Sequence, residues 1–144
     1  MTTAPHIRLV LWKAAKAIEN VDRASISGTG LQLSEFTIME VLLHKGPLPI
    51  NAIGEKVLLT SGSMTAAINR LAKKGFVRRI QDASDGRFFH VHLTEIGRLV
   101  IQKAFEKHAA NLEQVSAALS QNERDELVRL LKKIGRHAEQ VQMA

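Results

Sequence analysis

One stretch of the sequence, from Thr60 to Leu93, limits the possible folds more than any other. It reads TSGSMTAAINRLAKKGFVRRIQDASDGRFFHVHL and predicts an amphipathic helix followed directly by a two-stranded hairpin. Apolar residues recur at intervals of three and four between Met64 and Leu71, which gives the helix one apolar face. The opposite face is small or hydrogen-bonding at its start and basic toward its end: Gly62, Thr65, Ala66, Asn69, Arg70 and Lys73. Such a face suits a helix that lies in the major groove of DNA.

The hairpin is predicted from alternating apolar and polar residues. Lys74-Gly75 ends the helix, and the residues from Phe76 to Gln81 then alternate. From Phe88 to Leu93 the alternation places Phe89, Val91 and Leu93 on one side. The sequence DASDGR between the two runs supplies the turn formers Asp, Ser and Gly.

Three helices are expected before this stretch. The first runs from about Pro5 to Ser25, and the glycine-containing run from Ser25 to Gly30 then forms a turn rather than a phosphate-binding loop. Ser34 is the expected N-cap of the second helix, which Lys45-Gly46-Pro47 closes. A short helix follows from about Ile50 to Leu58. With the helix capped by Thr60-Ser61 it forms a helix-turn-helix, and the hairpin adds a wing.

Two long helices are expected after the wing. The first starts at Thr94-Glu95 and runs to about Ala118, with apolar residues at the spacing of a packed helix pair. Ser120-x-x-Glu123 is a capping box that opens the last helix. The terminal helices have no other large core to cover within 144 residues, so we expect them to bury apolar faces partly against a second copy. The predicted fold class is therefore mainly α with a small β-hairpin wing.

Charge and composition favour an anionic partner. The net charge is +6, and the residues from Thr60 to His90 carry six Lys or Arg against two Asp, which is +4 of that total. There is no cysteine, so disulfides and thiolate metal sites are excluded. The sequence has no run of about 18 apolar residues and no secretion signal. We expect a cytoplasmic protein without a membrane partner or a cofactor.

These elements, in this order, resemble the MarR family of bacterial and archaeal transcription regulators. The resemblance is densest in SGSMTAAINRLAKKGFVRR, DASDGR and VHLTEIG, which lie in register from Ser61 to Gly97. It implies one domain over residues 1–144, with a winged helix-turn-helix lobe at about 31–94 and a helical dimerisation region at about 5–27 and 95–142. It also implies a homodimer on a pseudo-palindromic operator, and a repressor that releases DNA on binding a small phenolic or anionic molecule.

The helix from Thr60 carries most of the candidate DNA-binding residues. Its free backbone N–H groups at Ser61, Gly62 and Ser63 could approach a phosphate. Asn can pair with adenine and Arg with guanine, so Thr65, Asn69 and Arg70 are candidates for contacts with base edges. Lys73 and Arg78, with Lys74 and Arg79, are candidates for phosphate contacts that carry no sequence information. Ordinary capping and a solvated helix face would explain the same residues.

The wing tip supplies a separate candidate site. Asp85-Gly86-Arg87 matches the family's D-x-R pattern, which implies an arginine in the minor groove and an aspartate that orients it. A narrow minor groove concentrates negative potential, and guanidinium is weakly hydrated, so the chemistry agrees. Gly86 stands where the family often has a polar or basic residue, which would leave this tip less charged.

Other interpretations of the sequence remain open. Trp12, Phe36 and Met39 are candidates for an effector pocket, although each also fits a core or a dimer seam. His90 and His92 lie two apart on a strand and could form part of a metal site. A hydrolase built on Ser61 or Ser63 lacks a nucleophile elbow, so we expect no enzymatic activity. A winged-helix module that binds proteins instead of DNA is the remaining alternative.

Overall fold

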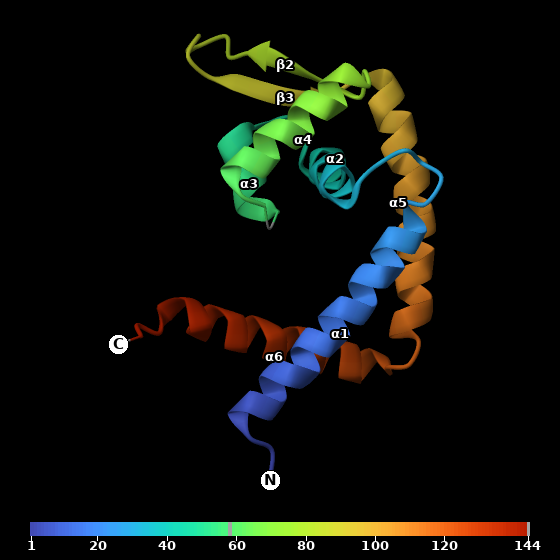
Figure 1. The fold of residues 1–144 in the computed structure, drawn as a ribbon, viewed down its shortest axis with the longest axis vertical. Coiled ribbons are helices and arrows are strands. Elements are labelled where there is room, and N and C mark those ends of the chain that lie inside the picture. The colour runs from blue at the N-terminus through green and yellow to red at the C-terminus, as the bar shows by residue number, and fades with distance from the viewer. Residues whose placement is uncertain (58, 144) are drawn as a thin grey trace. The chain divides into compact units, whose positions relative to one another are not determined.

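The structure is a computed structural model that describes residues 1–57 and 59–143; of these, the side chain of Ser61 is not described. It forms two compact units, Met1–Ala109 and Ala110–Ala144. The described chain forms the elements labelled in Figure 1: α1 (Ala4–Ser25), α2 (Leu33–Lys45), β1 (Leu48–Pro49), α3 (Ile50–Lys56), α4 (Ser61–Lys73), β2 (Val77–Gln81), β3 (Phe89–Leu93), α5 (Glu95–Ser116) and α6 (Gln121–Gln140). None of its helices combines the length and apolar character needed to cross a membrane. The expectation of a mainly helical fold with a small wing is confirmed.

The wing belongs to a three-stranded antiparallel sheet in the order β1-β3-β2. In the hairpin, Val77 lies opposite Leu93 and Gln81 lies opposite Phe89. The third strand, β1, was not expected from the sequence. It pairs Leu48 and Pro49 with Val91 and His90 of β3. A two-residue strand has no alternation to detect, and proline is tolerated because β1 lies at the sheet edge.

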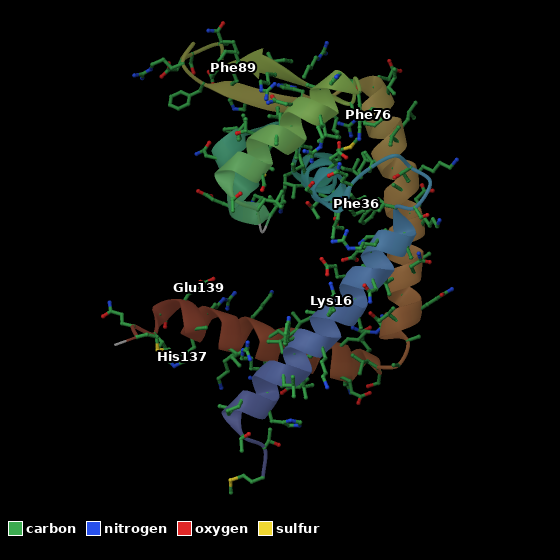
Figure 2. The ribbon with its side chains drawn as sticks, viewed as in Figure 1. Lys16, Phe36, Phe76, Phe89, His137 and Glu139 are labelled. Atoms are coloured by element: carbon green, nitrogen blue, oxygen red, sulfur yellow. The ribbon has the colours of Figure 1, made fainter. Side chains whose placement is uncertain are left out.

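The register of the hairpin separates its two faces. Residues directly opposite each other share a face, and side chains alternate along each strand. One face begins with the buried Val77 and Val91 and continues outward to Phe89, which is 45% exposed because the hairpin extends past the core. Figure 2 labels Phe89 on this hairpin. The opposite face carries Arg78 and His90.

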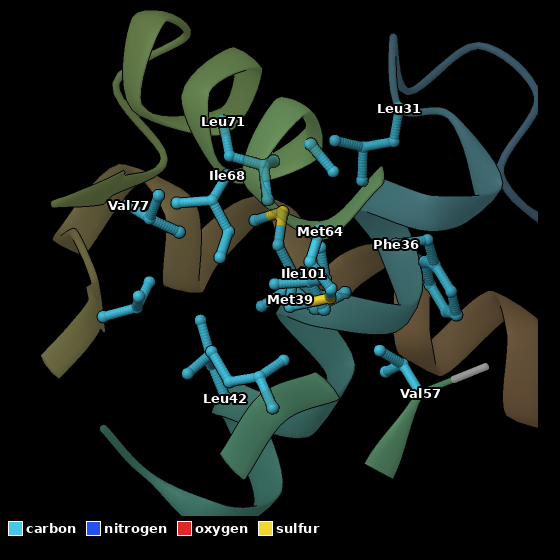
Figure 3. Packing of buried hydrophobic residues seen from close by; sticks show 14 of the residues in the cluster. Leu31, Phe36, Met39, Leu42, Val57, Met64, Ile68, Leu71, Val77 and Ile101 are labelled. Atoms are coloured by element: carbon cyan, nitrogen blue, oxygen red, sulfur yellow. The ribbon is translucent and has the colours of Figure 1, made fainter. Parts of the chain in front are cut away.

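The core lies where α2, α3 and α4 pack against the sheet and the first half of α5. The predicted inner face of α4 is confirmed, since Met64, Ala67, Ile68 and Leu71 are all buried. Figure 3 shows Met64, Ile68 and Leu71 in one cluster with Met39 and Ile101. Burial of this face orients α4, because only one side of the helix can turn inward while the other stays in solvent.

Several helix ends differ from the expectation. Gln32, not Ser34, is the N-cap of α2, and its backbone N–H donates to the Glu35 carboxylate at 2.8 Å. Ser34 is instead the second residue of the helix, because the capping box begins at Gln32 and is closed by Glu35. The helix α3 ends at Lys56, and the expected end at residue 58 lies outside the described residues. The capping box of Ser120 and Glu123 is confirmed, with Ser120 Oγ accepting from the Glu123 N–H at 3.2 Å.

Candidate nucleic-acid interface

The outer side of α4 is exposed and small at its N-terminal end. Thr60 caps the helix, accepting from the Ser63 N–H at 3.2 Å through its side-chain oxygen. A Cβ built on Gly62 would meet nothing within 4 Å, so the space in front of this turn is open. Gly62, Ser63, Thr65 and Asn69 are exposed. Since the Ser63 N–H is taken by this cap, the backbone N–H groups that precede it in the first turn are the ones left for an approaching anion.

Asn69 is held by a contact that the sequence did not predict. The Arg79 guanidinium on β2 donates to Asn69 Oδ1 at 2.5 Å. Arg79 shares the hairpin face that turns toward α4, whereas Arg78 lies on the opposite face. With its oxygen occupied, Asn69 keeps its amide N–H groups for another acceptor. No spacing rule connects residues ten apart on a helix and a strand, so only the fold could reveal this pair.

Arg70 does not extend from the exposed face of α4. Its Nη2 donates to Ser34 Oγ at 3.3 Å, and its Nε lies 3.8 Å from the Glu35 carboxylate on α2. Lys74, just after the helix, donates to both Glu35 oxygens at 2.9 and 2.8 Å. Lys73, between them, is exposed. The basic end of α4 therefore divides into an exposed lysine and two cations directed at α2.

The turn at the wing tip is fixed by short-range hydrogen bonds. The Asp82 carboxylate accepts from the Ser84 N–H at 2.8 Å and from the Ser84 hydroxyl at 2.7 Å. These two bonds lower the pKa of Asp82. The Gln81 side-chain amide donates to the Gly86 carbonyl oxygen at 2.6 Å. The tip is thus ordered by its own side chains, although it lies beyond the core.

At the wing tip, the Arg87 guanidinium is paired with the Asp85 carboxylate. Arg87 Nε donates to Asp85 Oδ1 at 3.1 Å and Nη2 donates to Oδ2 at 2.9 Å, a bidentate pair. The Arg87 backbone N–H also donates to Asp85. The guanidinium lowers the pKa of the Asp85 carboxyl. The Arg87 side chain is 84% exposed. The structure brings together the two residues that the sequence paired, and leaves the guanidinium open to solvent.

The sequence is similar to a known protein family and to characterised and uncharacterised regulators. The MarR family model matches residues 31–88. YkoM of Bacillus subtilis, an uncharacterized HTH-type transcriptional regulator, is 36% identical over 128 residues, which are 87% of this chain and 83% of YkoM. The HTH-type transcriptional regulator MhqR of the same organism is 33% identical over 132 residues, 92% of this chain and 91% of MhqR. The chain belongs to the MarR family.

The MarR-family fold is also found in a solved structure of BpsR from Bordetella bronchiseptica. The two match with a TM-score of 0.80 over 90% of this chain and 98% of that chain, at 19% identity, which shows a shared fold. The DNA binding of BpsR is regulated by 6-hydroxynicotinic acid. The curated relatives of this chain are transcription regulators, and no enzyme family is indicated.

An open groove of about 1450 Å³ lies beside the MarR-type lobe, within residues 1–109. Its walls come from the end of α1, the following loop, the outer side of α2 and the segment after α3. Apolar side chains such as Leu31, Val41 and Val57 line it together with the charged Glu40 and Lys45. Among the described residues of this lining, Trp12, Phe36 and Met39 do not occur.

The other sequence candidates for a ligand or a metal lie elsewhere. Phe36 and Met39 are buried in the core, and Trp12 is 63% exposed on α1, with the Arg8 guanidinium 5.7 Å from its ring centre. His90 Nδ1 lies 3.6 Å from Asp82. Over the part of the chain that the structure describes, no group of three His, Cys, Asp or Glu residues is placed to hold a metal ion.

A buried histidine lies where α5 passes α1 and α2. His108 Nδ1 is 3.6 Å from Asp22 Oδ1, and its ring meets Phe36 edge-on at 4.9 Å between ring centres. Burial raises the pKa of Asp22 although the nearby histidine opposes the shift. His108 is only 6% exposed among the residues that pack here.

Proposed function

We propose that this MarR-family regulator binds DNA in a sequence-specific way as a homodimeric repressor. The observation that carries the proposal is the combination of an exposed face on α4 with a guanidinium held at the wing tip by Asp85. A helix of this kind enters a major groove, and an arginine on an adjacent hairpin reaches the neighbouring minor groove. Ser63, Thr65, Asn69 and Lys73 are the helix residues proposed to meet DNA.

The proposed roles of these residues follow from their contacts. Asn69, oriented by Arg79, offers its amide to a base edge. Lys73 and Arg78 offer exposed charges to phosphates. Ser61 and Gly62 offer backbone N–H groups at the start of the helix. Arg70 is a weaker candidate for base contact than the sequence indicated, because its guanidinium is directed at Ser34 and Glu35.

The apolar faces of the terminal helices support the proposed dimer. On α6, Leu127, Leu130, Leu131 and Ile134 recur at helical spacing and are all exposed in the isolated chain. On α1, exposed apolar side chains also recur at helical spacing. Contiguous apolar surface of this kind is rare on a monomer and marks an interface. We infer that a second copy covers these faces, which would set the two α4 helices at a fixed spacing.

The groove beside α2 supports a proposed effector site. It combines apolar walls with the basic Arg23, Lys45 and Lys56, which outnumber the acidic Glu19 and Glu40, so it suits a small anionic aromatic molecule. The similar BpsR is regulated by a molecule of that chemistry. Such an effector would release the repressor from DNA.

Selection from a pool of random duplexes tests the proposal, followed by titration over a salt series. We expect a pseudo-palindromic sequence to be enriched, and log K to fall steeply with log salt as phosphate counterions are released. Selection without enrichment, combined with binding that does not change with salt, would contradict the proposal and favour a protein-binding module instead.

A further inference from the structure

Two cations at the end of α4, Arg70 and Lys74, lie against one buried carboxylate, that of Glu35. The Glu35 side chain is 0% exposed, and Lys74 Nζ donates to both of its oxygens. Arg70 Nε lies 3.8 Å from the same carboxylate and, among the described atoms, makes no hydrogen bond of its own. The Gln32 backbone N–H completes the set at 2.8 Å. Lys74 lies 39 residues from Glu35 in sequence, so only the fold brings the two together.

Because Glu35 is buried, breaking its contacts with Arg70 and Lys74 would cost free energy. A buried carboxylate is strongly unfavourable unless paired charges and hydrogen bonds compensate it. Lys74 is held further by donating to the Gly30 carbonyl oxygen at 2.9 Å, and Arg70 by donating to Ser34 Oγ at 3.3 Å. If either cation turned toward a DNA phosphate, Glu35 would lose a partner that water cannot replace.

Lys73 provides the contrast within the same turn. Both lysines are exposed residues, but the Lys74 ammonium donates to the buried Glu35 carboxylate, whereas Lys73 lies on the outer face of α4. Phosphate contacts raise affinity for all sequences alike and carry no sequence information. A regulator whose Lys74 and Arg70 both reached phosphates would therefore bind random DNA more tightly without reading it better.

We propose that Glu35 is a positioning residue that anchors the end of α4 to α2 and withholds Arg70 and Lys74 from DNA phosphates. The proposal rests on the DNA-binding function proposed above. It makes Glu35 a determinant of specificity although it touches no DNA, because it lowers binding to random sequences more than binding to the operator.

Glu35→Gln tests the proposal, since glutamine keeps the shape and can still accept from Gln32. Binding would be titrated over a salt series with two probes, the duplex enriched by selection and a duplex of scrambled sequence. We expect tighter binding to the scrambled duplex, a salt slope steeper by about 0.9 for each cation set free, and a lower ratio of specific to non-specific affinity. If the substitution only disrupted the structure, binding to both duplexes would weaken and the salt slope would not become steeper.

Two controls separate the effect of the position of Glu35 from that of a change in net charge. Glu106→Gln, at an exposed site on α5, makes the same change in net charge and should leave the affinity ratio unchanged. Lys73→Met and Lys74→Met remove neighbouring charges. We expect Lys73→Met to lower the salt slope by about 0.9 per chain and Lys74→Met to leave it unchanged.

Two results would overturn the inference: equal slope losses for Lys73→Met and Lys74→Met, or a folded Glu35→Gln protein with unchanged binding to the scrambled duplex. If the single variants do not fold, Glu35→Gln with Lys74→Met replaces the ion pair by an uncharged one. Its slope should be steeper than that of the wild type, because Arg70 is freed, and a shallower slope would also overturn the inference. A wild-type protein that binds neither duplex would overturn the DNA-binding proposal itself.

Discussion

Replacing Arg87 with alanine removes the one guanidinium held at the wing tip. In the wild type it is oriented by two hydrogen bonds to Asp85 while remaining 84% exposed. If it enters a minor groove, it releases counterions and reads the width of the groove. The variant loses both effects, whereas the fold should persist because the side chain contributes nothing to the core.

The size of the effect follows from charge. Each cation that neutralises DNA contributes about 0.9 to the slope of log K against log salt, and a dimer carries two copies of Arg87. Alanine should therefore make the slope shallower by about 1.8. Between about 50 and 200 mM salt, the affinity difference between wild type and variant should then shrink by about tenfold. Arg87→Lys keeps the charge but loses the bidentate fit to Asp85, so we expect a few-fold weaker binding with an unchanged slope.

Fluorescence anisotropy of a labelled operator duplex over a salt series measures both quantities. Arg129→Ala is the matched control, because Arg129 on α6 is another exposed arginine that makes two hydrogen bonds to a carboxylate, that of Glu126. It should not change the slope. Equal slopes for Arg87→Ala and the wild type would refute a minor-groove role for this residue.

Three further variants test the fold and the assembly. Gly97→Ala would place a Cβ against the backbone of Phe76, 2.7 Å from its carbonyl carbon, so we expect a loss of about 3 kcal/mol in urea unfolding; a loss below about 1 kcal/mol would contradict this contact. Burial raises the pKa of Asp22, so its charged form destabilises the fold above that pKa, and the effect vanishes below the unfolded value of about 3.9. Asp22→Asn should therefore raise the melting temperature at pH 7 but not below about pH 3.9, and a lower melting temperature at pH 7 would show that the pairing with His108 outweighs burial. Leu130→Asp should convert the proposed dimer to monomer in sedimentation, whereas an unchanged dimer would place the interface elsewhere.

The α4 helix and the hairpin could be predicted because their signals are local. Apolar spacing identifies the buried side of α4, and the turn formers around Asp85 locate the wing tip. The pairing of Asp85 with Arg87 was also within reach, since the two residues lie two apart in sequence.

The partners of Asn69, Arg70 and Lys74 could not be predicted, because they come from other elements. Charge and helical position made Arg70 a candidate for base contact, yet a buried glutamate on α2 holds it. Nothing local distinguishes Lys74 from Lys73. The exposure of Phe89 could not be predicted either, since alternation gives the face of a strand but not how far the core extends along it.

Hydroxyl-radical footprinting on the selected operator tests the central claim most directly. Two copies of α4 and of Arg87, related by a two-fold axis, should protect two regions on one face of the duplex, with centres roughly 34–36 Å apart. Arg87→Ala should remove protection only where the minor groove flanks each region. Protection of a single region, or an unchanged footprint with Arg87→Ala, would contradict DNA reading by a dimer that uses α4 and the wing.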